Sequence, residues 1–584
     1  MPKDSPIQPV IFTNVARCRD CYRCVRVCPV KAIRVRDGQA SVDADRCIGC
    51  GTCVRECPQE AKTYRRDIDR VEEILAGGGF VAASLAPSFA GAFEPWEWLR
   101  IPAALRRLGF SHVAETAIGA YLVARETASI VQDRTRPHVC TACPAVVSYI
   151  EKYDPDRVPD LLPLVSPMMA HARHIKKKFG FGAKVVFIGP CAAKKMEADR
   201  WEFRGLVDAV LTFEELGDLL HRRAIDIRGC EESSFDEIPF GKARFFPVEG
   251  GALATSALPT DILDDRLIFV SGFGEVQESL KASGHPGSSA VIEPLMCPHG
   301  CVNGPGIRRE GNPFERRARV IRYAQRQPPA KGQEPEPLDL STNFQVSSKG
   351  QEPFVTEEKV REILVKTGKA DPLQQLNCGA CGYSSCRDQA EAVVRGMAEL
   401  EMCMPYMRRL AEQRSDRIME TSPNAIVILD EQFRIISINP AFARIFRTDR
   451  ACIGRHISHF VDPDPFERVA SGETQVFDGV VRDRDSDRVM REVAYALKAE
   501  HQFVGIFSNI TAARLNAERI EKIKLETIEQ ARELYAHQIE MAKIMANFLG
   551  DHTARGELLL QKLMDAVNSE PSLNEKKDPG PGRA

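Results

Sequence analysis

The feature that most constrains the fold is a cysteine spacing that occurs twice near the N-terminus. The chain reads Cys18-x2-Cys21-x2-Cys24-x3-Cys28-Pro29 and then Cys47-x2-Cys50-x2-Cys53-x3-Cys57-Pro58, and it contains 19 cysteines in total. No apolar N-terminal segment is present, and no apolar run reaches the roughly 20 residues that span a bilayer. We therefore expect a cytoplasmic protein without a membrane segment. Cytoplasmic thiols are kept reduced, which favours metal or cluster ligation over disulfides.

This repeat has the spacing of two-cluster bacterial ferredoxins, in which the fourth cysteine of each run binds the other cluster. One 4Fe-4S cluster is expected on Cys18, Cys21, Cys24 and Cys57, and a second on Cys47, Cys50, Cys53 and Cys28. A zinc site, the alternative, explains neither the eight ligands nor the Cys-Pro endings. Residues 1–75 are therefore predicted to be a ferredoxin-like domain that carries electrons.

Length and charge limit the remaining possibilities. A chain of 584 residues should contain three to five domains, since one core rarely grows past about 300 residues. The formal net charge is −2. No global positive field argues for nucleic acid or an anionic membrane as a partner, so partners must be inferred from motifs.

Residues 76–325 carry short apolar runs between helical stretches. Lys184 to Ile188, Leu267 to Val270 and Ala290 to Ile292 suit strands that are covered on both faces in an α/β domain. Cys191 and Cys297 follow two of these runs closely. Open α/β sheets place their sites on loops after strand ends.

Three segments in this region resemble the signatures of the FeFe-hydrogenase catalytic domain, in the same order. They are Cys143-Pro144, Pro190-Cys191-Ala192-Ala193-Lys194-Lys195-Met196-Glu197 and Glu293-Pro294-Leu295-Met296-Cys297-Pro298-His299-Gly300-Cys301. The resemblance implies an H-cluster, which is a 4Fe-4S cubane joined to a diiron subsite with CO, cyanide and dithiolate ligands. It assigns the cubane to Cys143, Cys191, Cys297 and Cys301, with Cys301 as the bridge to the diiron subsite.

The resemblance also implies residues that contact the ligands of the diiron subsite. Lys194 matches a lysine that donates to one cyanide, and Ala86 and Pro87 match a small-residue loop beside the other. A lysine ammonium suits an anionic ligand because it is a compact charge. The alternative is that Lys194 and Lys195 are solvated residues at a helix start.

The chain departs from the family where protons are carried. The family usually has two adjacent cysteines in the first signature, but Ala142 occupies the position of the proton-relay cysteine, and a methyl group cannot carry a proton. The acidic relay positions fall near Thr127 and Ile130, with Glu126 as a neighbouring substitute. Glu197 in the second signature is a further candidate catalytic residue. Loss of a general acid or base typically costs about 10²- to 10⁴-fold in rate, so slow turnover is expected.

Four further positions differ from the usual pattern or have no assigned role. Gly189 and Leu295 stand at or near positions where the family commonly has methionine. His299 replaces a usual glycine and is either an alternative proton group or a structural loop residue. Cys140 is interpreted as a small buried apolar residue in preference to a ligand.

A second cysteine region follows a predicted linker at residues 326–354. Cys378-x2-Cys381-x4-Cys386-x16-Cys403 resembles the small 4Fe-4S domain of some electron-transfer and corrinoid-enzyme subunits. We assign it to residues 355–412 and expect helices at Glu357 to Lys366 and Arg387 to Glu401 to bring Cys403 back to the loop. A zinc site with the same ligands is the alternative.

The C-terminal part resembles a signalling module. Residues 413–512 resemble a PAS domain, from Ser422-Pro423-Asn424-Ala425-Ile426 to Ser508-Asn509-Ile510-Thr511. Cys452, His456 and His459 are conceivable contacts for a haem or flavin, although no flavin-binding cysteine motif is present.

Residues 513–570 contain a charged helix with apolar residues at seven-residue spacing. Five of six positions in one seam are apolar, at Ala513, Ile520, Leu534, Met541 and Phe548, whereas the second seam is polar. This pattern predicts an imperfect coiled coil, and the alternative is one helix packed on the PAS domain. Residues 571–584 are predicted to be a disordered tail.

Together these patterns predict a multidomain α/β and α+β protein. It should contain a ferredoxin-like two-cluster domain, an α/β H-cluster domain, a small helical 4Fe-4S domain, a PAS α+β domain and a C-terminal helix. The expected function is slow splitting of H2, with the redox state relayed to the PAS and coiled-coil region of a homodimer. The expected partners are H2, protons, a ferredoxin-like electron carrier and a downstream kinase, phosphatase or regulator. The alternatives are a working ferredoxin-linked hydrogenase and an iron-sulfur scaffold without the diiron subsite.

Overall fold

The structure is a computed structural model. It describes residues 9–256, 258, 266–283, 285, 288–308, 310–331, 334–347, 354–482, 488–548 and 560–565. The chain forms two compact units, Met1–Arg408 and Arg409–Ala584, and each is described by itself. The described part of the chain contains no helix long and apolar enough to cross a bilayer.

The ferredoxin-like region consists of two short antiparallel strand pairs and two one-turn helices. β1 (Ile11–Thr13) pairs with β4 (Lys62–Tyr64), and β2 (Ile33–Arg36) pairs with β3 (Gln39–Val42). α1 (Arg23–Val27) and α2 (Thr52–Arg55) each contain a cysteine of the repeat in their first two residues. Val25, Ile33 and Ile48 are buried at the centre of this small core.

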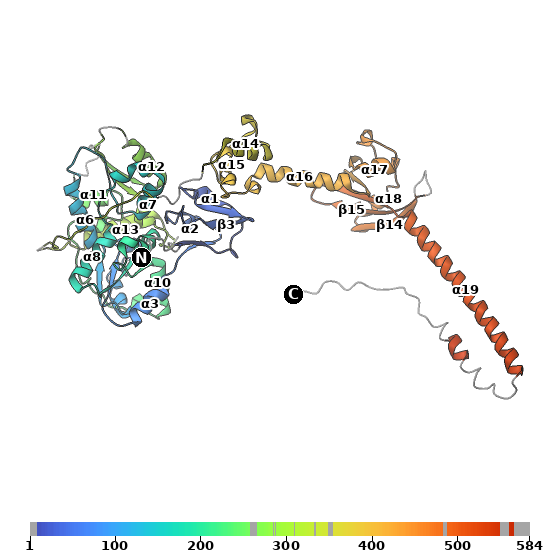
Figure 1. Cartoon of the computed structure of the whole chain (residues 1–584), viewed down its shortest axis with the longest axis horizontal. Coiled ribbons are helices and arrows are strands. Elements are labelled where there is room, and N and C mark those ends of the chain that lie inside the picture. The colour runs from blue at the N-terminus through green and yellow to red at the C-terminus, as the bar shows by residue number, and fades with distance from the viewer. Residues whose placement is uncertain are drawn as a thin grey trace. The chain divides into compact units, whose positions relative to one another are not determined.

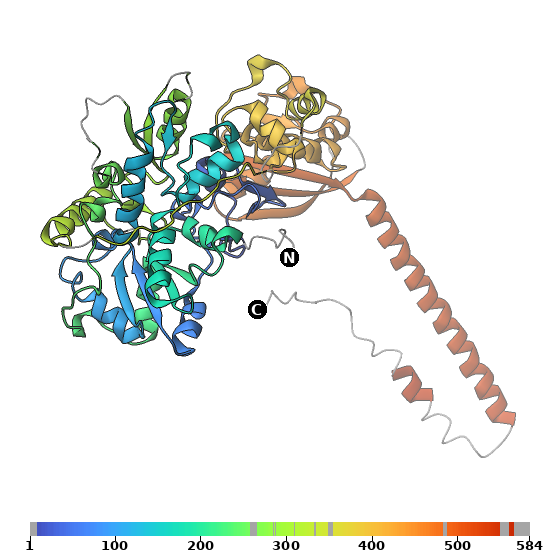
Figure 2. The ribbon, with the colours of Figure 1, turned by 60° about the vertical axis from the view of Figure 1, so that its left-hand side comes forward.

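The next region contains a four-stranded parallel sheet with the order β6-β5-β8-β9. Its strands are β5 (Val81–Leu85), β6 (His112–Glu115), β8 (Lys184–Gly189) and β9 (Ala209–Thr212). Nearly all of their residues are buried, as expected for strands covered on both faces. Figure 1 shows α8 (Pro167–Phe179) on one side of this sheet and α3 (Ile68–Ala76) and α10 (Phe213–Arg222) on the other. In Figure 2 the light-blue strands of this sheet, β5 and β6, lie between helices.

A second, three-stranded parallel sheet has the order β10-β11-β7. It contains β7 (His138–Val139), β10 (Leu267–Ser271) and β11 (Val291–Leu295), and the helices of this half are α6 (Ala117–Ile130), α7 (Pro144–Tyr153), α11 (Gly251–Thr255) and α12 (Phe273–Ala282). α6 packs closely on α8, because a Cβ at Gly119 would lie 2.2 Å from the Pro167 carbonyl oxygen. The predicted α/β domain is therefore confirmed, and it is built on two sheets. Three further helices of the region are α4 (Phe89–Ala92), α5 (Ile101–Leu108) and α9 (Ala193–Asp199).

The predicted linker begins where expected, but its described part is packed on the α/β region. α13 (Pro313–Arg326) ends where the linker was expected to begin. The described part of the segment lies against the α/β region, since Leu340 is buried and its carbonyl accepts from the backbone N–H of Val165. Leucines in a polar segment give little sequence signal, and here one of them fills a site on the α/β core. Residues 332–333 and 348–353 of the segment lie outside the described residues.

The small cysteine region is helical, and one predicted boundary was wrong. α14 (Glu357–Lys366) has the predicted bounds, but α15 (Cys386–Val394) ends well before Glu401. Gly396 adopts a left-handed backbone with φ 68°, which ends the helix, as glycine commonly does at this position. A 3-10 turn at Leu400–Met402 then leads to Cys403.

The second unit contains a five-stranded antiparallel sheet with the order β13-β12-β16-β15-β14. The strands are β12 (Ala425–Leu429), β13 (Ile435–Ile438), β14 (Val476–Arg482), β15 (Val489–Leu497) and β16 (Gln502–Asn509), with α17 (Pro440–Ile445) and α18 (Asp464–Ala470) between β13 and β14. The Asn439 side chain caps α17 by accepting from the backbone N–H of Phe442. Phe442, Phe466 and Phe507 are fully buried in the core of this α+β fold.

Two long helices flank this sheet in the sequence. α16 (Met404–Thr421) precedes it, and α19 (Thr511–Phe548) follows it. Ile520, Leu534 and Met541 on α19 are 57%, 64% and 49% exposed, so the apolar seam is not packed on the sheet. The side chain of Phe548 and the predicted tail from Pro571 lie outside the described residues.

Candidate functional site

The four cysteines predicted to hold the cubane follow strand ends of both parallel sheets. Cys143 precedes α7 shortly after β7, and Cys191 lies two residues after β8. Cys297 lies two residues after β11, and Cys301 begins a short 3-10 helix. Because parallel strands end at the same edge, the fold brings residues distant in sequence to one place.

The electrostatic interactions group these four thiols into one set. Burial raises the pKa of Cys191 to about 12, with a further contribution from Cys143. Burial also raises the pKa of Cys301, with contributions from Cys143 and Cys191, and the pKa of Cys297, with contributions from all three other cysteines. The buried thiols therefore favour their neutral form until a cation compensates the thiolates. Four thiol donors in one place fit an iron-sulfur cube.

The four cysteines are not arranged around the position of a single metal ion. Among the residues that the structure describes, no group of three or more His, Cys, Asp or Glu side chains has the geometry to hold one metal ion. The thiols are nevertheless near enough to perturb one another electrostatically.

Three predicted catalytic positions meet beside this set. The Lys194 ammonium lies 2.8 Å from a Glu197 carboxylate oxygen and 3.2 Å from the Ala142 carbonyl oxygen. Lys194 is 8% exposed, so it is not a solvated helix-start residue. Its charge lowers the pKa of the Cys191 and Cys301 thiols, which places a cation next to the predicted cubane ligands.

Lys195 is also buried, and it has a structural environment of its own. Its ammonium lies 3.0 Å from Glu215 and 3.3 Å from Asp67, and it donates to the carbonyl of Val210. The alternative interpretation of solvated lysines is therefore wrong for both residues.

The predicted small-residue loop lies beside the Cys191 loop. The backbone N–H of Ala86 donates to the carbonyl of Ile188, and a Cβ at Gly189 would lie 3.1 Å from the Ala86 Cβ. Pro87 follows directly and precedes α4. The same Cβ at Gly189 would lie 2.6 Å from the ring of Phe187, so this ring occupies the space that a side chain at position 189 would need.

Ala142 borders a small cavity of about 10 Å³. Thr127, Cys140 and Thr141 also line it, together with apolar residues and Ser256. Glu126, the suggested substitute for the acidic relay, is not among the lining residues and lies 3.8 Å from Arg125. Cys140 is buried among apolar residues, as predicted from its sequence position.

Glu293 is a buried carboxyl group that the sequence interpretation missed. It accepts from the backbone N–H of Leu253 at 3.0 Å, and its second oxygen has no hydrogen-bond partner among the described residues. Burial raises its pKa to about 7, and it interacts electrostatically with both Cys301 and Cys140. The available signal was a charged residue within the apolar run of β11.

His299 lies on the surface of the Cys297 loop. It adopts a left-handed backbone with φ 67°, and its ring lies 4.8 Å from the ring of Phe314. Its backbone N–H donates to the Ser271 hydroxyl. These contacts match the structural interpretation of this residue.

The ferredoxin-like cysteines form two sets that match the predicted crossed pattern. Burial raises the pKa of Cys24, and Cys18, Cys21 and Cys57 raise it further. Burial likewise raises the pKa of Cys28 to about 12, with contributions from Cys50 and Cys47, and Cys53 interacts with the same three residues. Backbone N–H groups of Ala32 and Ala61 donate to the sulfurs of Cys28 and Cys57 at 3.2 and 3.3 Å.

The second of these sets lies next to the predicted cubane ligands. Cys50 interacts electrostatically with Cys143. A Cβ at Gly51 would lie 2.5 Å from Pro305, and one at Gly49 would lie 2.4 Å from the sulfur of Met196. Only glycine permits this close approach at positive φ, so the two cysteine loops are in direct contact.

The fourth cysteine set is also brought together. Cys381 interacts electrostatically with Cys403 and Cys378, and Lys369 interacts with Cys403 and Cys386. Cys386 and Cys403 are buried, whereas Cys378 is exposed. The Asn377 side chain accepts from the backbone N–H of Cys386 at 2.8 Å, which holds the loop on the start of α15.

The three conceivable cofactor contacts of the PAS-like region lie in different environments. His459 is exposed, and its ring contacts the carbonyl of His456 at 3.0 Å. The ring of His456 contacts the Ser458 hydroxyl at 2.8 Å. Cys452 is buried in the core of this unit.

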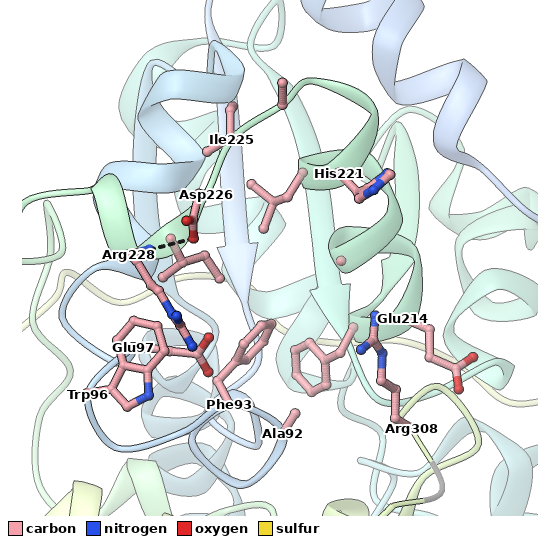
Figure 3. A pocket seen from close by; sticks show the side chains of 15 residues that line it. Ala92, Phe93, Trp96, Glu97, Glu214, His221, Ile225, Asp226, Arg228 and Arg308 are labelled. Carbon is pink, nitrogen blue, oxygen red and sulfur yellow. Dashed lines mark hydrogen bonds between the residues drawn. The ribbon is translucent and has the colours of Figure 1, made fainter.

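A separate pocket of about 720 Å³ has none of the predicted site residues in its lining. Figure 3 shows Trp96, Glu97 and Arg228 at one end and Glu214 and Arg308 at the other. Its lining includes no cysteine.

The fold and the cysteine sets define a multidomain α/β iron-sulfur protein. Residues 79–305 match the family described as the iron-only hydrogenase large subunit, C-terminal domain. Residues 10–58 match a 4Fe-4S dicluster domain, residues 373–405 an Fe-S cluster domain and residues 413–480 a PAS domain. The chain therefore contains an FeFe-hydrogenase H-cluster domain together with two further iron-sulfur domains and a PAS domain.

Curated relatives include hydrogenases and a protein with a different description. The NADP-reducing hydrogenase subunit HndD of Solidesulfovibrio fructosivorans is 28% identical over 366 residues, which cover 51% of this chain and 58% of that protein. Iron hydrogenase 1 of Clostridium pasteurianum is 27% identical over 283 residues, which cover 40% and 49%. The cytosolic Fe-S cluster assembly factor NAR1 of Vanderwaltozyma polyspora is 35% identical over 96 residues, which cover 16% and 18%. The chain thus spans about half of the length of the hydrogenases it matches.

Solved structures with similarity to this chain include FeFe-hydrogenases and a PAS domain. A variant of the FeFe-hydrogenase HydA1 from Chlamydomonas reinhardtii is 20% identical with a TM-score of 0.38, and the match covers 48% of this chain and 99% of that one. The PAS domain of an HTR-like protein from Haloarcula marismortui is 25% identical with a TM-score of 0.16, and the match covers 18% and 99%.

Proposed function

We propose that this chain is a hydrogen-responsive FeFe-hydrogenase of low turnover, whose redox state is relayed through 4Fe-4S clusters to the PAS domain and α19. The observation that carries this proposal is the set of Cys143, Cys191, Cys297 and Cys301 with the buried Lys194 ammonium beside it. An H-cluster held by these residues would supply heterolytic cleavage of H2.

In this proposal the Lys194 ammonium binds an anionic cyanide ligand of the diiron subsite and compensates its negative charge. Its ammonium is buried, and Glu197 at 2.8 Å fixes its position without occupying all three of its donors. A remaining N–H can therefore donate to an anionic cyanide ligand. Ala86 and Pro87 belong to the loop beside Gly189 and the Cys191 loop, and they would offer small apolar groups to the second ligand.

Ala142 explains the low turnover. The residue at this position would pass protons between the diiron subsite and the protein, and its methyl group has no exchangeable proton. Slow turnover suits sensing, because a sensor needs only to reach a redox equilibrium with H2.

Electrons would leave through the ferredoxin-like region. Cys50 lies within electrostatic reach of Cys143, and the Cys50 loop contacts the loop that follows Cys301 at Gly51 and Pro305. The first acceptor is therefore the set of Cys28, Cys47, Cys50 and Cys53, followed by the set that contains Cys24.

The PAS domain and α19 would deliver the output to another protein. The exposed apolar residues of α19, such as Leu534 and Met541, suit a seam that is covered in a homodimer. The recipient would be a downstream kinase, phosphatase or regulator.

A second candidate is a working ferredoxin-linked hydrogenase in which the PAS domain only supports dimerisation. Glu293 favours this candidate, because a buried carboxyl group with a pKa of about 7 near Cys301 is suited to proton transfer at neutral pH.

A third candidate is an iron-sulfur scaffold without the diiron subsite. The relative described as a cytosolic Fe-S cluster assembly factor supports it. The buried Lys194 argues against it, because a scaffold without the diiron subsite does not require a buried ammonium within electrostatic reach of Cys191 and Cys301.

The test compares H2-evolution rate with H2-dependent reduction in one sample of matured full-length protein. The proposal predicts slow evolution from a low-potential donor but complete reduction of the clusters under H2. Fast evolution would favour the working hydrogenase. Full iron content without any reduction under H2 would favour the scaffold.

A further inference from the structure

Lys369 is a buried cation that contacts a predicted cluster ligand directly. It lies just after α14 and is 7% exposed, and its ammonium donates to the sulfur of Cys403 at 3.0 Å. Cys386 also interacts electrostatically with this ammonium.

A buried ammonium needs an anion nearby, because the desolvation of an unpaired charge is costly. The groups beside the Lys369 ammonium are the sulfur of Cys403, at 3.0 Å, and Cys386. Neutral thiols would compensate the ammonium poorly, whereas the thiolates of a bound cluster would compensate it well. The residues of this set therefore fit a 4Fe-4S cluster.

Other cations near the cysteine sets are held differently. The Lys62 ammonium donates to the Thr13 hydroxyl and to the Ala40 carbonyl. The Lys194 ammonium is paired with Glu197, which offsets part of its charge. Of these three lysines, only Lys369 donates a hydrogen bond to a cysteine sulfur. Its charge should therefore have the strongest effect on the reduction potential of a bound cluster.

The Lys369 region is in contact with the ferredoxin-like region within the first unit. The Lys31 ammonium donates to the Gly382 carbonyl at 2.8 Å, and the Glu399 carboxylate accepts from the backbone N–H of Gly38 at 3.2 Å. Lys31 interacts electrostatically with both Cys28 and Cys381, so the two cysteine sets are neighbours.

We propose that Lys369 raises the reduction potential of the cluster held by Cys378, Cys381, Cys386 and Cys403, and so makes it the acceptor end of the internal electron path. This assignment rests on the proposed function for the source of electrons. Oxidation of one H2 releases two protons and two electrons, and each 4Fe-4S cluster takes one electron. One electron would therefore reduce this cluster and the other would remain on a ferredoxin-like cluster.

The physical basis is that reduction adds negative charge beside a fixed positive charge. The Lys369 ammonium is shielded from water, so the attraction is not strongly screened. The residue that follows Cys403 begins α16, which places this cluster at the start of the helix that leads toward the PAS domain.

The test is a redox titration of the full chain with reconstituted clusters, with chemical mediators and electron paramagnetic resonance. The signal of this cluster is assigned as the one lost in C403S. In K369M we expect the reduced-to-oxidised ratio at the wild-type midpoint to fall about tenfold, which is about 59 mV for a one-electron couple. K369R, which keeps the charge, and K366M, which removes an exposed lysine of α14, should titrate like the wild type.

Two results would overturn the proposal. One is a K369M midpoint equal to that of the wild type. The other is loss of this cluster's iron in both K369M and K369Q, since Lys369 would then be needed for assembly. The titration uses chemical reductants, so its result does not depend on H2 cleavage. A protein that is inert to H2 would refute the proposed function and leave the role of Lys369 standing.

Discussion

Replacement of Ala142 by cysteine tests why this site should be slow. Ala142 borders the cavity of about 10 Å³ together with Cys140 and Thr127, and its carbonyl oxygen accepts from Lys194 at 3.2 Å. The cavity has room for about one water molecule, so an added sulfur atom should fit without overpacking. We expect the stability to change by less than about 1.5 kcal/mol.

The expected gain follows from the chemistry of proton transfer. A positioned general acid or base contributes about 10²- to 10⁴-fold in rate, which corresponds to about 2.7 to 5.4 kcal/mol of activation free energy. Ala142→Cys should therefore increase H2 evolution by at least about 10²-fold. Ala142→Ser, with a hydroxyl that can hydrogen-bond but does not ionise near neutral pH, should gain less.

The assay is H2 evolution from a reduced low-potential donor, with wild type and both variants compared at equal iron content and equal diiron occupancy. Equal occupancy matters because a loading defect would also lower the rate. If Ala142→Cys turns over no faster than the wild type, the missing thiol does not limit the rate, and the account of low turnover is wrong.

Three further predictions concern buried charges. Glu293→Gln should lower H2 turnover and remove the limb of the pH–rate profile near the pKa of about 7, whereas unchanged turnover would exclude Glu293 from proton transfer. Lys195→Met leaves Glu215 buried without its cation, whereas Asp67 keeps its ion pair with Arg65, so thermal unfolding should show a loss of about 3 to 5 kcal/mol. Burial raises the pKa of Glu492 to about 8 from 4.5, so its protonated form stabilises the folded state below pH 4.5 and this stability is lost as the pH rises through 8. The full loss is about 5 kcal/mol at 1.36 kcal/mol per pH unit. Glu492→Gln should therefore slow hydrogen exchange in β15 and β16 at pH 9 relative to wild type, and equal exchange rates would contradict this.

The cysteine sets could be predicted because ligand spacing is local. The spacing within each short loop identifies two or three ligands. The order of the motifs, which is the same as in the family, identifies the ligands that lie far away in sequence. The strands at Lys184, Leu267 and Val291 could be predicted because buried parallel strands are continuous apolar runs.

Buried polar groups could not be predicted in the same way. Nothing in the local sequence distinguishes Lys195 or Lys369 from a solvated lysine, and only long-range packing places Glu215 and Cys403 beside them. The partly packed linker was missed for the same reason, since Leu340 has no periodic partners. The early end of α15 depends on the conformation of one glycine, Gly396.

The Ala142 and Lys369 proposals concern opposite ends of the same proposed electron path. Ala142 would limit the rate at which H2 supplies electrons, and Lys369 would determine which cluster holds an electron at equilibrium. A sensor needs a cluster that stays reduced under H2 more than it needs fast turnover, because its output depends on the fraction of that cluster in the reduced state.

The central claim is that Cys143, Cys191, Cys297 and Cys301 hold an H-cluster with its diiron subsite. Infrared spectroscopy of matured full-length protein tests this most directly, because CO and cyanide ligands have stretching bands in a region free of protein absorption. The account predicts bands of both ligands in the wild type, a shift of the cyanide bands in Lys194→Met, and no bands in Cys301→Ser. Full iron content in the wild type without any such bands would contradict it.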